Sequence, residues 1–301
     1  AMDRLRVVAL FCLCSSSLLL TNKLLLTAIP LPSFVAACQF TASASWVLLL
    51  RTLRLATVEP LAWARVRQYL LHILFFISAV YCNMRALGES NVETVIVCRA
   101  CCPLFVSLLE WFVAGREIPS ARSLALLCAL IGGAVGYVKT DREFNLQGVA
   151  AYRWVFAYYV MICLSDTWGK RLSHLKWRSF WGPVLYSNLL SAPPMAIAAG
   201  VTGELARFSA NRWGAASYLL LLLTCAQSAA ISYFGWRCRS MVSATSYTVI
   251  GVANKLLTVL GNALIWDKHA SSTGIAYLIG CLVAASFYRE APIRGRHTRK
   301  L

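Results

Sequence analysis

The feature that most constrains this chain is the recurrence of apolar stretches about 20 residues long from one end to the other. A helix of ~20 residues crosses a hydrocarbon core ~30 Å thick. Because lipid offers the backbone no hydrogen-bond partner, each crossing segment must satisfy its own peptide groups, which favours an all-α helix bundle. The expected spans are residues 5–29, 33–52, 67–87, 91–114, 120–138, 149–169, 179–201, 213–235, 240–266 and 270–288.

The composition agrees with a membrane protein. Of the 301 residues, 59% are hydrophobic and 14% are charged, whereas soluble domains carry roughly 25% charged residues. The net charge is +17, which in a soluble protein would point to nucleic acid. Here most basic residues lie in short loops between apolar spans, so we expect no nucleic-acid partner and interpret the charge as a signal of topology.

The basic residues predict how the chain is oriented. The loops on one side, together with both ends of the chain, hold 19 Lys and Arg, and the opposite loops hold five. The densest groups are Arg51–Arg67, Lys170–Arg178 and the tail from Arg289. Because Lys and Arg accumulate on the cytosolic side, we expect both termini in the cytosol and an even number of spans, here ten.

Two similar segments indicate an internal repeat. Residues 85–96 and 239–250 share Arg, Thr, Val and Ile at matching positions. One copy opens the fourth span and the other opens the ninth, so the copies enter the membrane from opposite sides. Inverted repeats are typical of secondary transporters, which bind substrate at the repeat interface near the midplane. We expect one transporter domain, residues 1–301, with inverted repeats at about 1–146 and 147–301.

Charged side chains inside the spans indicate function, because charge in hydrocarbon is costly. Lys255 lies deep in the ninth span, and Arg99 lies early in the fourth. Neither has a carboxylate nearby in sequence, and a phosphate-bearing substrate would supply the counter-charge. The alternative is an ion pair with an acid from another span. Snorkelling or a structural ion pair competes with function for the other charges in the spans, which are Lys23, Glu110, Arg153 and Asp166.

Uncharged polar residues inside the spans add candidates. Gly251 would let a ligand or a helix approach the backbone closely, and Asn254 offers donors and an acceptor for sugar hydroxyls or a base edge. The cluster Tyr186–Asn188 precedes Pro193–Pro194, which we expect to kink or break the seventh span. Ser232 lies in the eighth span. For each of them, contact between helices is the alternative.

The sequence contains no pattern of catalytic or metal-binding residues. Its four His show no metal spacing, and no phosphate-binding loop of an ATPase occurs. Nearly all of its 12 Cys lie in apolar spans, where Cys behaves as a small hydrophobe. We therefore expect no metal, no cofactor and no enzymatic activity.

Several of these residues fall in segments that resemble one family. The segment Gly251-Val252-Ala253-Asn254-Lys255 is similar to that family's Gly-Ala-Leu-Asn-Lys, and Tyr247 lies in a Ser-Tyr-Thr that resembles the Thr-Tyr-Ser before it. Further matches are Ser232 with Tyr233, Asn22 with Lys23, and Arg99 after Ser90-Asn91-Val92. The whole chain resembles the nucleotide-sugar transporters of the drug/metabolite transporter superfamily, in the branch of the GDP-mannose transporters and the plant and algal Golgi GDP-sugar transporters.

The resemblance implies roles for these residues. Residues 251–255 would bind the sugar and phosphate end. The family's guanine-reading Phe-Tyr-Asn-Asn corresponds to Leu185-Tyr186-Ser187-Asn188, which keeps Tyr and the last Asn. An aromatic residue that faces the sugar corresponds to Phe11, which lacks a hydroxyl. The resemblance therefore leaves base and sugar open.

The function implied is that of a Golgi antiporter, with cycling to the endoplasmic reticulum left open. It would exchange cytosolic GDP-sugar, GDP-mannose foremost, for lumenal GMP by alternating access. Lys255 with Arg99 would hold the diphosphate, Tyr186 and Asn188 the base, and the sugar would lie against Gly251, Asn254, Tyr247 and Ser232. The expected partners are the nucleotide sugar, the nucleoside monophosphate and membrane lipid, with a homodimer left open.

Four alternatives remain at this point. The cargo could be GDP-fucose or a UDP-sugar. The chain could be a triose-phosphate or phosphate antiporter of the same fold. A cation-coupled drug exporter would need a buried Glu near the centre, for which Glu110 is the candidate. An intramembrane enzyme would need paired catalytic residues.

Overall fold

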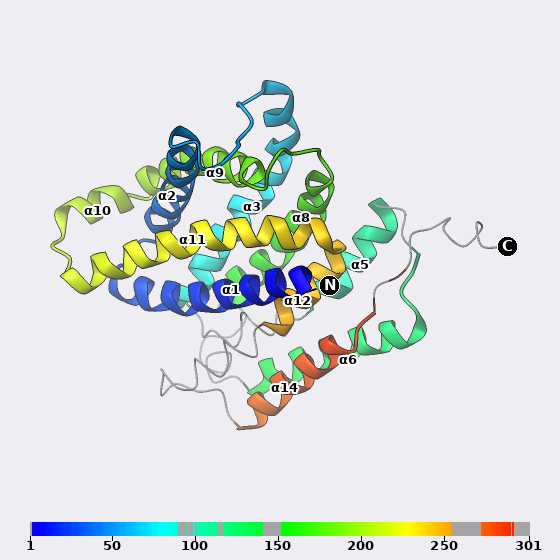
Figure 1. Cartoon of the computed structure of the whole chain (residues 1–301). Helices are drawn as coiled ribbons and strands as arrows, with labels where there is room; N and C mark the ends of the chain where they lie inside the picture. The colour runs from blue at the N-terminus through cyan, green and yellow to red at the C-terminus, as the bar shows by residue number, and fades with distance from the viewer. Residues whose placement is uncertain are drawn as a thin grey trace.

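The computed structural model describes residues 2–89, 95, 99, 101–113, 117–140, 152–254, 272–289 and 291, and every regular element within them is an α-helix (Figure 1). The helices are α1 (Met2–Ala28), α2 (Pro32–Thr52), α3 (Trp63–Glu89), α5 (Cys102–Val113), α6 (Ala121–Thr140), α8 (Arg153–Ser173), α9 (Trp181–Val201), α10 (Glu204–Ala210), α11 (Ala215–Met241), α12 (Ala244–Ala253) and α14 (Ser272–Ser286).

The outer surface of these helices is apolar. Val201, Phe112 and Leu222 are 83%, 74% and 66% exposed, and such side chains are suited to lipid rather than to water. Among the described helices, α1, α2, α3, α9 and α11 are long and apolar enough to cross a membrane. The chain is therefore an all-helical, multi-pass membrane protein.

The helices pack in pairs that are distant in the sequence. Helix α3 lies along α8, α1 along α11, and α2 along α9, and α6 packs on α14 (Figure 1). A further pair joins α5 to α12. Each pair combines a helix from the first half of the chain with one from the second half, so the two halves share one core.

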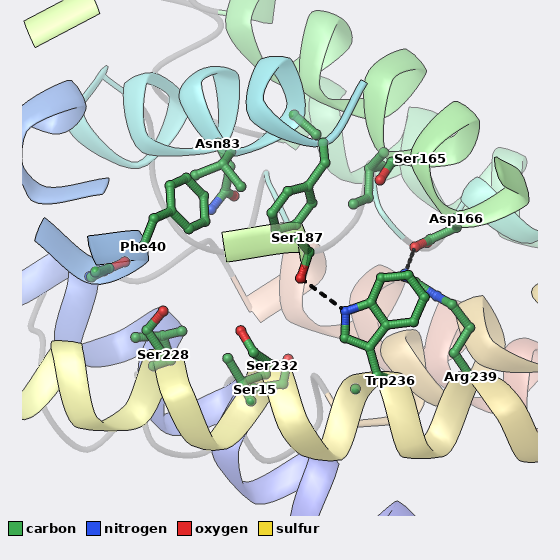
Figure 2. Close-up of a pocket in the computed structure, with 18 of the residues that line it drawn as sticks. Ser15, Phe40, Asn83, Ser165, Asp166, Ser187, Ser228, Ser232, Trp236 and Arg239 are labelled. Carbon is green, nitrogen blue, oxygen red and sulfur yellow. Dashed lines mark hydrogen bonds and ion pairs between the residues drawn. The ribbon is translucent and has the colours of Figure 1, made fainter. Parts of the chain in front are cut away.

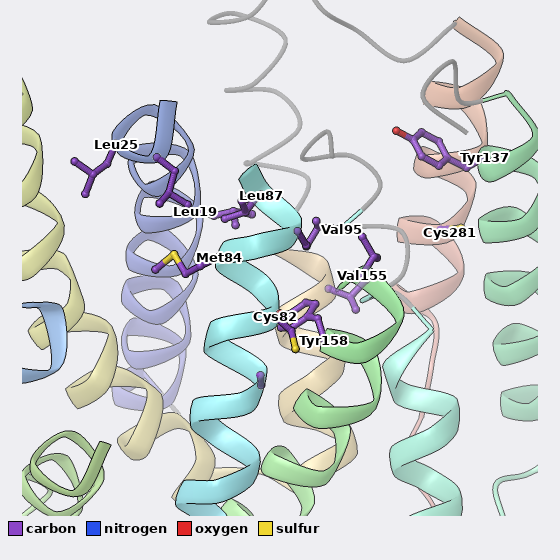
Figure 3. Close-up of a cluster of buried hydrophobic side chains, with 14 of the residues drawn as sticks. Leu19, Leu25, Cys82, Met84, Leu87, Val95, Tyr137, Val155, Tyr158 and Cys281 are labelled. Atoms are coloured by element: carbon purple, nitrogen blue, oxygen red, sulfur yellow. The ribbon is translucent and has the colours of Figure 1, made fainter. Parts of the chain in front are cut away.

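The largest buried cluster lies where these pairs meet (Figure 3). Leu25 of α1, Leu87 of α3 and Val155 of α8 are completely buried in it. Tyr137 of α6 and Cys281 of α14 extend the cluster toward the α6–α14 pair. Close packing of this kind holds membrane helices together, because lipid tails are as apolar as the side chains themselves.

Carboxylates from other elements stabilise two helix starts. The backbone N–H of Phe34 in α2 donates to Glu204 Oε2 at 2.8 Å. At the start of α12, Glu110 of α5 accepts from the backbone N–H of Thr245 at 3.3 Å and also from its hydroxyl. Negative charge is favourable at a helix N-terminus, where backbone N–H groups lack partners. Glu110 therefore has a structural role at α12.

The helix ends differ from the expected spans in instructive ways. Helix α2 (Pro32–Thr52) nearly coincides with the expected span 33–52. Helix α11, in contrast, continues to Met241 instead of ending at 235. The expectation that Arg239 lies in the loop after this span was wrong. Cations usually mark the membrane surface, but Arg239 is buried in α11, and Asp166 of α8 compensates its charge.

Two further features differ from expectation. Helix α9 runs unbroken from Trp181 to Val201 with Pro193–Pro194 inside it, so the prolines do not break the helix; a kink there stays a prediction. Its packing along α2 supports the turn in which the prolines remove hydrogen bonds. The short helix α10 was not expected at all. The structure describes only part of the expected spans 91–114 and 240–266, as α5 and α12.

Candidate functional site

A cavity of about 210 Å³ lies at the centre of the helix bundle (Figure 2). Side chains of α1, α2, α3, α8, α9, α11 and α12 line it, together with Arg99. A smaller adjoining cavity shares Arg99, Asn22 and Asn83 with it. The polar and charged residues of the main lining are Ser15, Asn22, Gln39, His72, Asn83, Arg99, Tyr158, Ser165, Asp166, Ser187, Ser228, Ser232, Arg239 and Tyr247.

Arg99 is the first of two described cations in this cavity. Its Nη1 donates to the Tyr158 hydroxyl of α8 at 2.5 Å. No described carboxylate lies within ion-pair distance of its guanidinium. Gly251 of α12 lies against it, since a β-carbon at this position would be 3.4 Å from Arg99 Nη2. A guanidinium in this setting is suited to binding an anion.

Arg239 is the second cation, and it forms an ion pair. Its Nη2 donates to Asp166 Oδ1 at 2.6 Å, with side chains 11% and 2% exposed (Figure 2). The guanidinium carbon lies 4.4 Å from the ring centre of Tyr247 and 5.3 Å from that of Trp236. Sequence reasoning missed this pair, because the two residues are far apart in the chain and both lie near the ends of spans.

Uncharged polar groups line the rest of the cavity. Gln39 Nε2 of α2 donates to Asn22 Oδ1 of α1 at 2.8 Å, and Asn83 Oδ1 of α3 is buried without a hydrogen-bond partner among the described residues. In Figure 2, Asn83, Phe40 and Ser228 lie toward one end, while Trp236, Asp166 and Arg239 lie toward the other. The cavity therefore has amide and hydroxyl groups toward one end and the Arg239–Asp166 ion pair with Trp236 toward the other, and Arg99 shares the smaller cavity with Asn22 and Asn83.

Six of the predicted site residues line this cavity. They are Phe11, Asn22, Arg99, Ser187, Ser232 and Tyr247. Phe11 and Tyr247 face each other, with ring centres 5.1 Å apart. Asn83, Asp166, Arg239 and His72 also line it, but they were not predicted as ligands. His72 is buried in an aromatic cluster with Phe76 and Trp236, and no local sequence pattern distinguishes it.

The predicted segment at the end of α12, residues 251–254, lies beside the cavity rather than in its lining. Val252 is completely buried in the main apolar cluster, and Ala253 is the last residue of the helix. Asn254 is 2% exposed, and its side-chain amide has no hydrogen-bond partner among the described residues. Its carbonyl accepts from Ser16 Oγ at 2.8 Å. The predicted phosphate ligand Lys255 lies outside the described residues.

Tyr186 and Asn188 lie behind the cavity wall. Tyr186 is completely buried, and its hydroxyl donates to the Pro60 carbonyl and accepts from the Ala62 N–H, both at 2.8 Å. Asn188 Nδ2 donates to Val184 O at 2.8 Å and to Ser232 Oγ at 3.2 Å. Ser187, between them in sequence, lines the cavity and accepts from Trp236 Nε1 at 3.1 Å.

The other span charges have partners away from the main cavity. Lys23 Nζ donates to the Leu87 carbonyl at 2.5 Å, which ties α1 to α3. Arg153 is an exposed partner of Glu89 at 3.5 Å. Glu110 holds the start of α12, as described above. Asp166 is the exception, because its ion pair is part of the cavity wall.

These observations define a class. A multi-pass helical membrane protein that encloses a polar cavity with arginines in its lining has the architecture of a membrane transporter. The Triose-phosphate Transporter family matches residues 4–285 of the chain. The chain belongs to this family, and it is a transporter rather than an enzyme.

Individual relatives agree with this assignment. The chain is 35% identical to a protein of Arabidopsis thaliana named GDP-fucose transporter 1, over 93% of this chain and 84% of that one. It is 32% identical to the GDP-mannose transporter GONST3 of the same plant, over 96% and 78%. One solved crystal structure aligns with a TM-score of 0.61 at 15% identity, over 93% of this chain and 96% of that chain, which concerns the fold alone.

Proposed function

We propose that this protein is a Golgi nucleotide-sugar antiporter that exchanges a cytosolic GDP-sugar for lumenal GMP. The Golgi location rests on the family resemblance and on no feature of the cavity. The guanine base is supported by two relatives that are named for GDP-linked sugars. One of them is named for fucose and the other for mannose, so the cargo is one of these two GDP-sugars.

The observation that carries this proposal is Arg99. It is a cation in the cavity of a membrane protein, its guanidinium donates to a phenol hydroxyl, and no described carboxylate pairs with it. A positive charge in this place is costly unless an anion arrives to compensate it. The diphosphate of a nucleotide sugar is such an anion, and Lys255 would add a second cation.

The rest of the lining supports the two remaining parts of the substrate. Amide and hydroxyl groups such as Asn22, Asn83 and Ser228 offer the donors and acceptors that sugar hydroxyls need. The aromatic pair of Phe11 and Tyr247 offers a flat apolar surface to a ring. We propose that Ser187 and Ser232 contact the substrate directly, while Asn188 positions Ser232.

The helix pairing supports ten spans and two inverted repeats, at about 1–146 and 147–301, while the distribution of basic residues supports cytosolic termini. If α1, α2, α3, α5 and α6 correspond to α8, α9, α11, α12 and α14, the α3–α8 pair corresponds to α11–α1, and the other three pairs correspond to themselves. A two-fold relation of this kind is what inverted repeats produce. Alternating access would follow from rocking the α1–α11 side of the bundle against the α3–α8 side.

The size of the cavity also supports a moving carrier. About 210 Å³ is less than the ~300–1,000 Å³ of pockets that hold drug-sized ligands. A nucleotide sugar therefore needs the cavity to widen before it binds.

The test is uptake into proteoliposomes. Vesicles that contain the purified protein and GMP should take up GDP-mannose or GDP-fucose much faster than vesicles loaded with buffer or UMP. Competition between the two sugars, with UDP-sugar and triose phosphate included, identifies the cargo. Uptake that ignores lumenal GMP, or a preference for triose phosphate, would refute the proposal.

Single-residue variants test the site itself. Arg99→Gln and Lys255→Ala should each lower uptake at least tenfold, because the substrate loses a charged partner. Arg153→Gln is the matched control, since Arg153 carries the same charge but pairs with Glu89 outside the cavity. Wild-type uptake by Arg99→Gln would remove the observation on which the proposal rests.

A further inference from the structure

We propose that Arg239 is a second phosphate-binding residue of the cavity and that Asp166 positions it. The inference rests on the proposed function and deepens it. It adds a phosphate ligand, Arg239, that lies outside the segments whose resemblance suggested a nucleotide-sugar site.

The placement of Arg239 is built by several elements. Asp166 of α8 accepts from Nη2 at 2.6 Å, and the guanidinium lies over the rings of Tyr247 and Trp236. Gly169 of α8 makes room for it, since a β-carbon there would be 2.6 Å from Arg239 Nη1. A side chain fixed on three sides loses little conformational freedom when it binds a ligand.

The guanidinium has donor capacity to spare. Arginine carries five N–H groups in a planar fork, and the ion pair with Asp166 engages Nη2. The Nε atom is buried and has no hydrogen-bond partner among the described residues. A buried donor without an acceptor is unfavourable. Nε is enclosed in this state of the cavity, and because Arg239 lines that cavity, the widening that substrate entry requires would let a phosphate oxygen reach this donor while Asp166 stays in place.

Arg239 and Arg99 flank one short stretch of α12. Arg239 lies over Tyr247, and Arg99 lies against Gly251. Four residues separate these two positions, which is about one helical turn or ~6 Å along the axis. A diphosphate group presents oxygens on two neighbouring phosphorus atoms. Because residues four apart lie on the same face of a helix, we infer that the two arginines flank this face of α12 and that each can bind one phosphate of the diphosphate.

The charges of the cavity agree with this arrangement. The described charged residues of the lining are Arg99, Arg239 and Asp166, which leaves one positive charge in excess. If Arg239 served the fold alone, a neutral pair in the positions of Arg239 and Asp166 would leave nucleotide binding unchanged. If Arg239 binds phosphate, the neutral pair must weaken the binding of phosphate-bearing ligands and spare the nucleoside.

The experiment compares GDP with guanosine by calorimetry on the purified, detergent-solubilised protein. The double variant Arg239→Gln with Asp166→Asn removes both charges and keeps a hydrogen-bonding pair. We expect it to weaken GDP binding roughly tenfold and to change guanosine binding less than twofold. The control is Arg237→Gln with Asp3→Asn, which neutralises another ion pair of α11, at 2.9 Å, outside the cavity lining. It should bind both ligands as the wild type does.

A second, more conservative variant separates a loss of binding from a loss of folding. Arg239→Lys keeps the charge and the pairing with Asp166 but lacks the Nε donor, so it should weaken GDP binding several-fold and leave guanosine binding unchanged. Unchanged GDP affinity in a folded variant, or equal losses for GDP and guanosine, would overturn the inference. If the wild-type protein itself does not prefer GDP over guanosine, the proposed function fails instead.

Discussion

Gly251 and Arg99 face each other so closely that a β-carbon at position 251 would lie 3.4 Å from the Arg99 Nη2. Gly251 is buried in α12, while Arg99 is held from the other side by the Tyr158 hydroxyl of α8. The guanidinium is therefore placed between two helices, with room at position 251 for a β-carbon in van der Waals contact and little beyond it.

A larger residue at position 251 should displace Arg99. Gly251→Ala adds one methyl group in ordinary van der Waals contact with Arg99 and should be tolerated, whereas Gly251→Val adds branches that press on the guanidinium. We expect Gly251→Val to lower GDP-sugar uptake about tenfold or more, because small misplacements of a charged ligand are costly. The control is Gly280→Val in α14, where a β-carbon would meet nothing within 4 Å. Normal uptake by Gly251→Val would show that Arg99 does not need this position.

Tyr186 should matter for stability rather than for base recognition. Its hydroxyl joins the Pro60 carbonyl and the Ala62 N–H, between α2 and α3. Tyr186→Phe leaves these two groups unsatisfied, and we expect a loss of about 1–3 kcal/mol in unfolding free energy. Guanosine affinity should stay unchanged, whereas Ser187→Ala should weaken it. Thermal unfolding and calorimetry measure both quantities. A Tyr186→Phe variant of normal stability with weakened guanosine binding would assign the hydroxyl to the base instead.

Glu110 should act on α12 rather than on ion coupling. Glu110→Ala removes the acceptor for the Thr245 backbone N–H and hydroxyl, and we expect a stability loss of about 1–3 kcal/mol. Glu110→Gln retains an acceptor and should lose less. Transport by Glu110→Gln should remain near normal and should not depend on a proton gradient. If this variant is stable but inactive, Glu110 is a coupling residue, and the exporter alternative gains support.

Much of the fold could be predicted from local sequence. The start of α2 is marked by Pro30 and Pro32, because proline favours the first turn of a helix and disfavours its interior. The end of α11 could not be predicted in the same way. Arg237 and Arg239 look alike in sequence, yet Arg237 is partly exposed, while Arg239 is buried beside Asp166. The partner that makes the difference comes from a distant helix.

The candidate site shows the same limit. Arg99 could be identified because a cation within an apolar run is visible locally. Asn83 could not, since an amide near the end of a span has no distinctive neighbours. Tyr186 was selected as a base ligand from a motif whose Ser187 lines the cavity, but a sequence does not reveal which side of a helix faces the substrate.

The pairing of α2 with α9 bears on how substitutions would shift this transporter between inward-facing and outward-facing states. In the proposed two-fold relation, α2 and α9 would exchange places with each other, while the α1–α11 pair would exchange with α3–α8. If so, a substitution between α2 and α9 should act on inward-facing and outward-facing states in similar measure. A substitution between α1 and α11 should act on one of two equivalent helix pairs, so it should shift the resting population toward one face of the membrane.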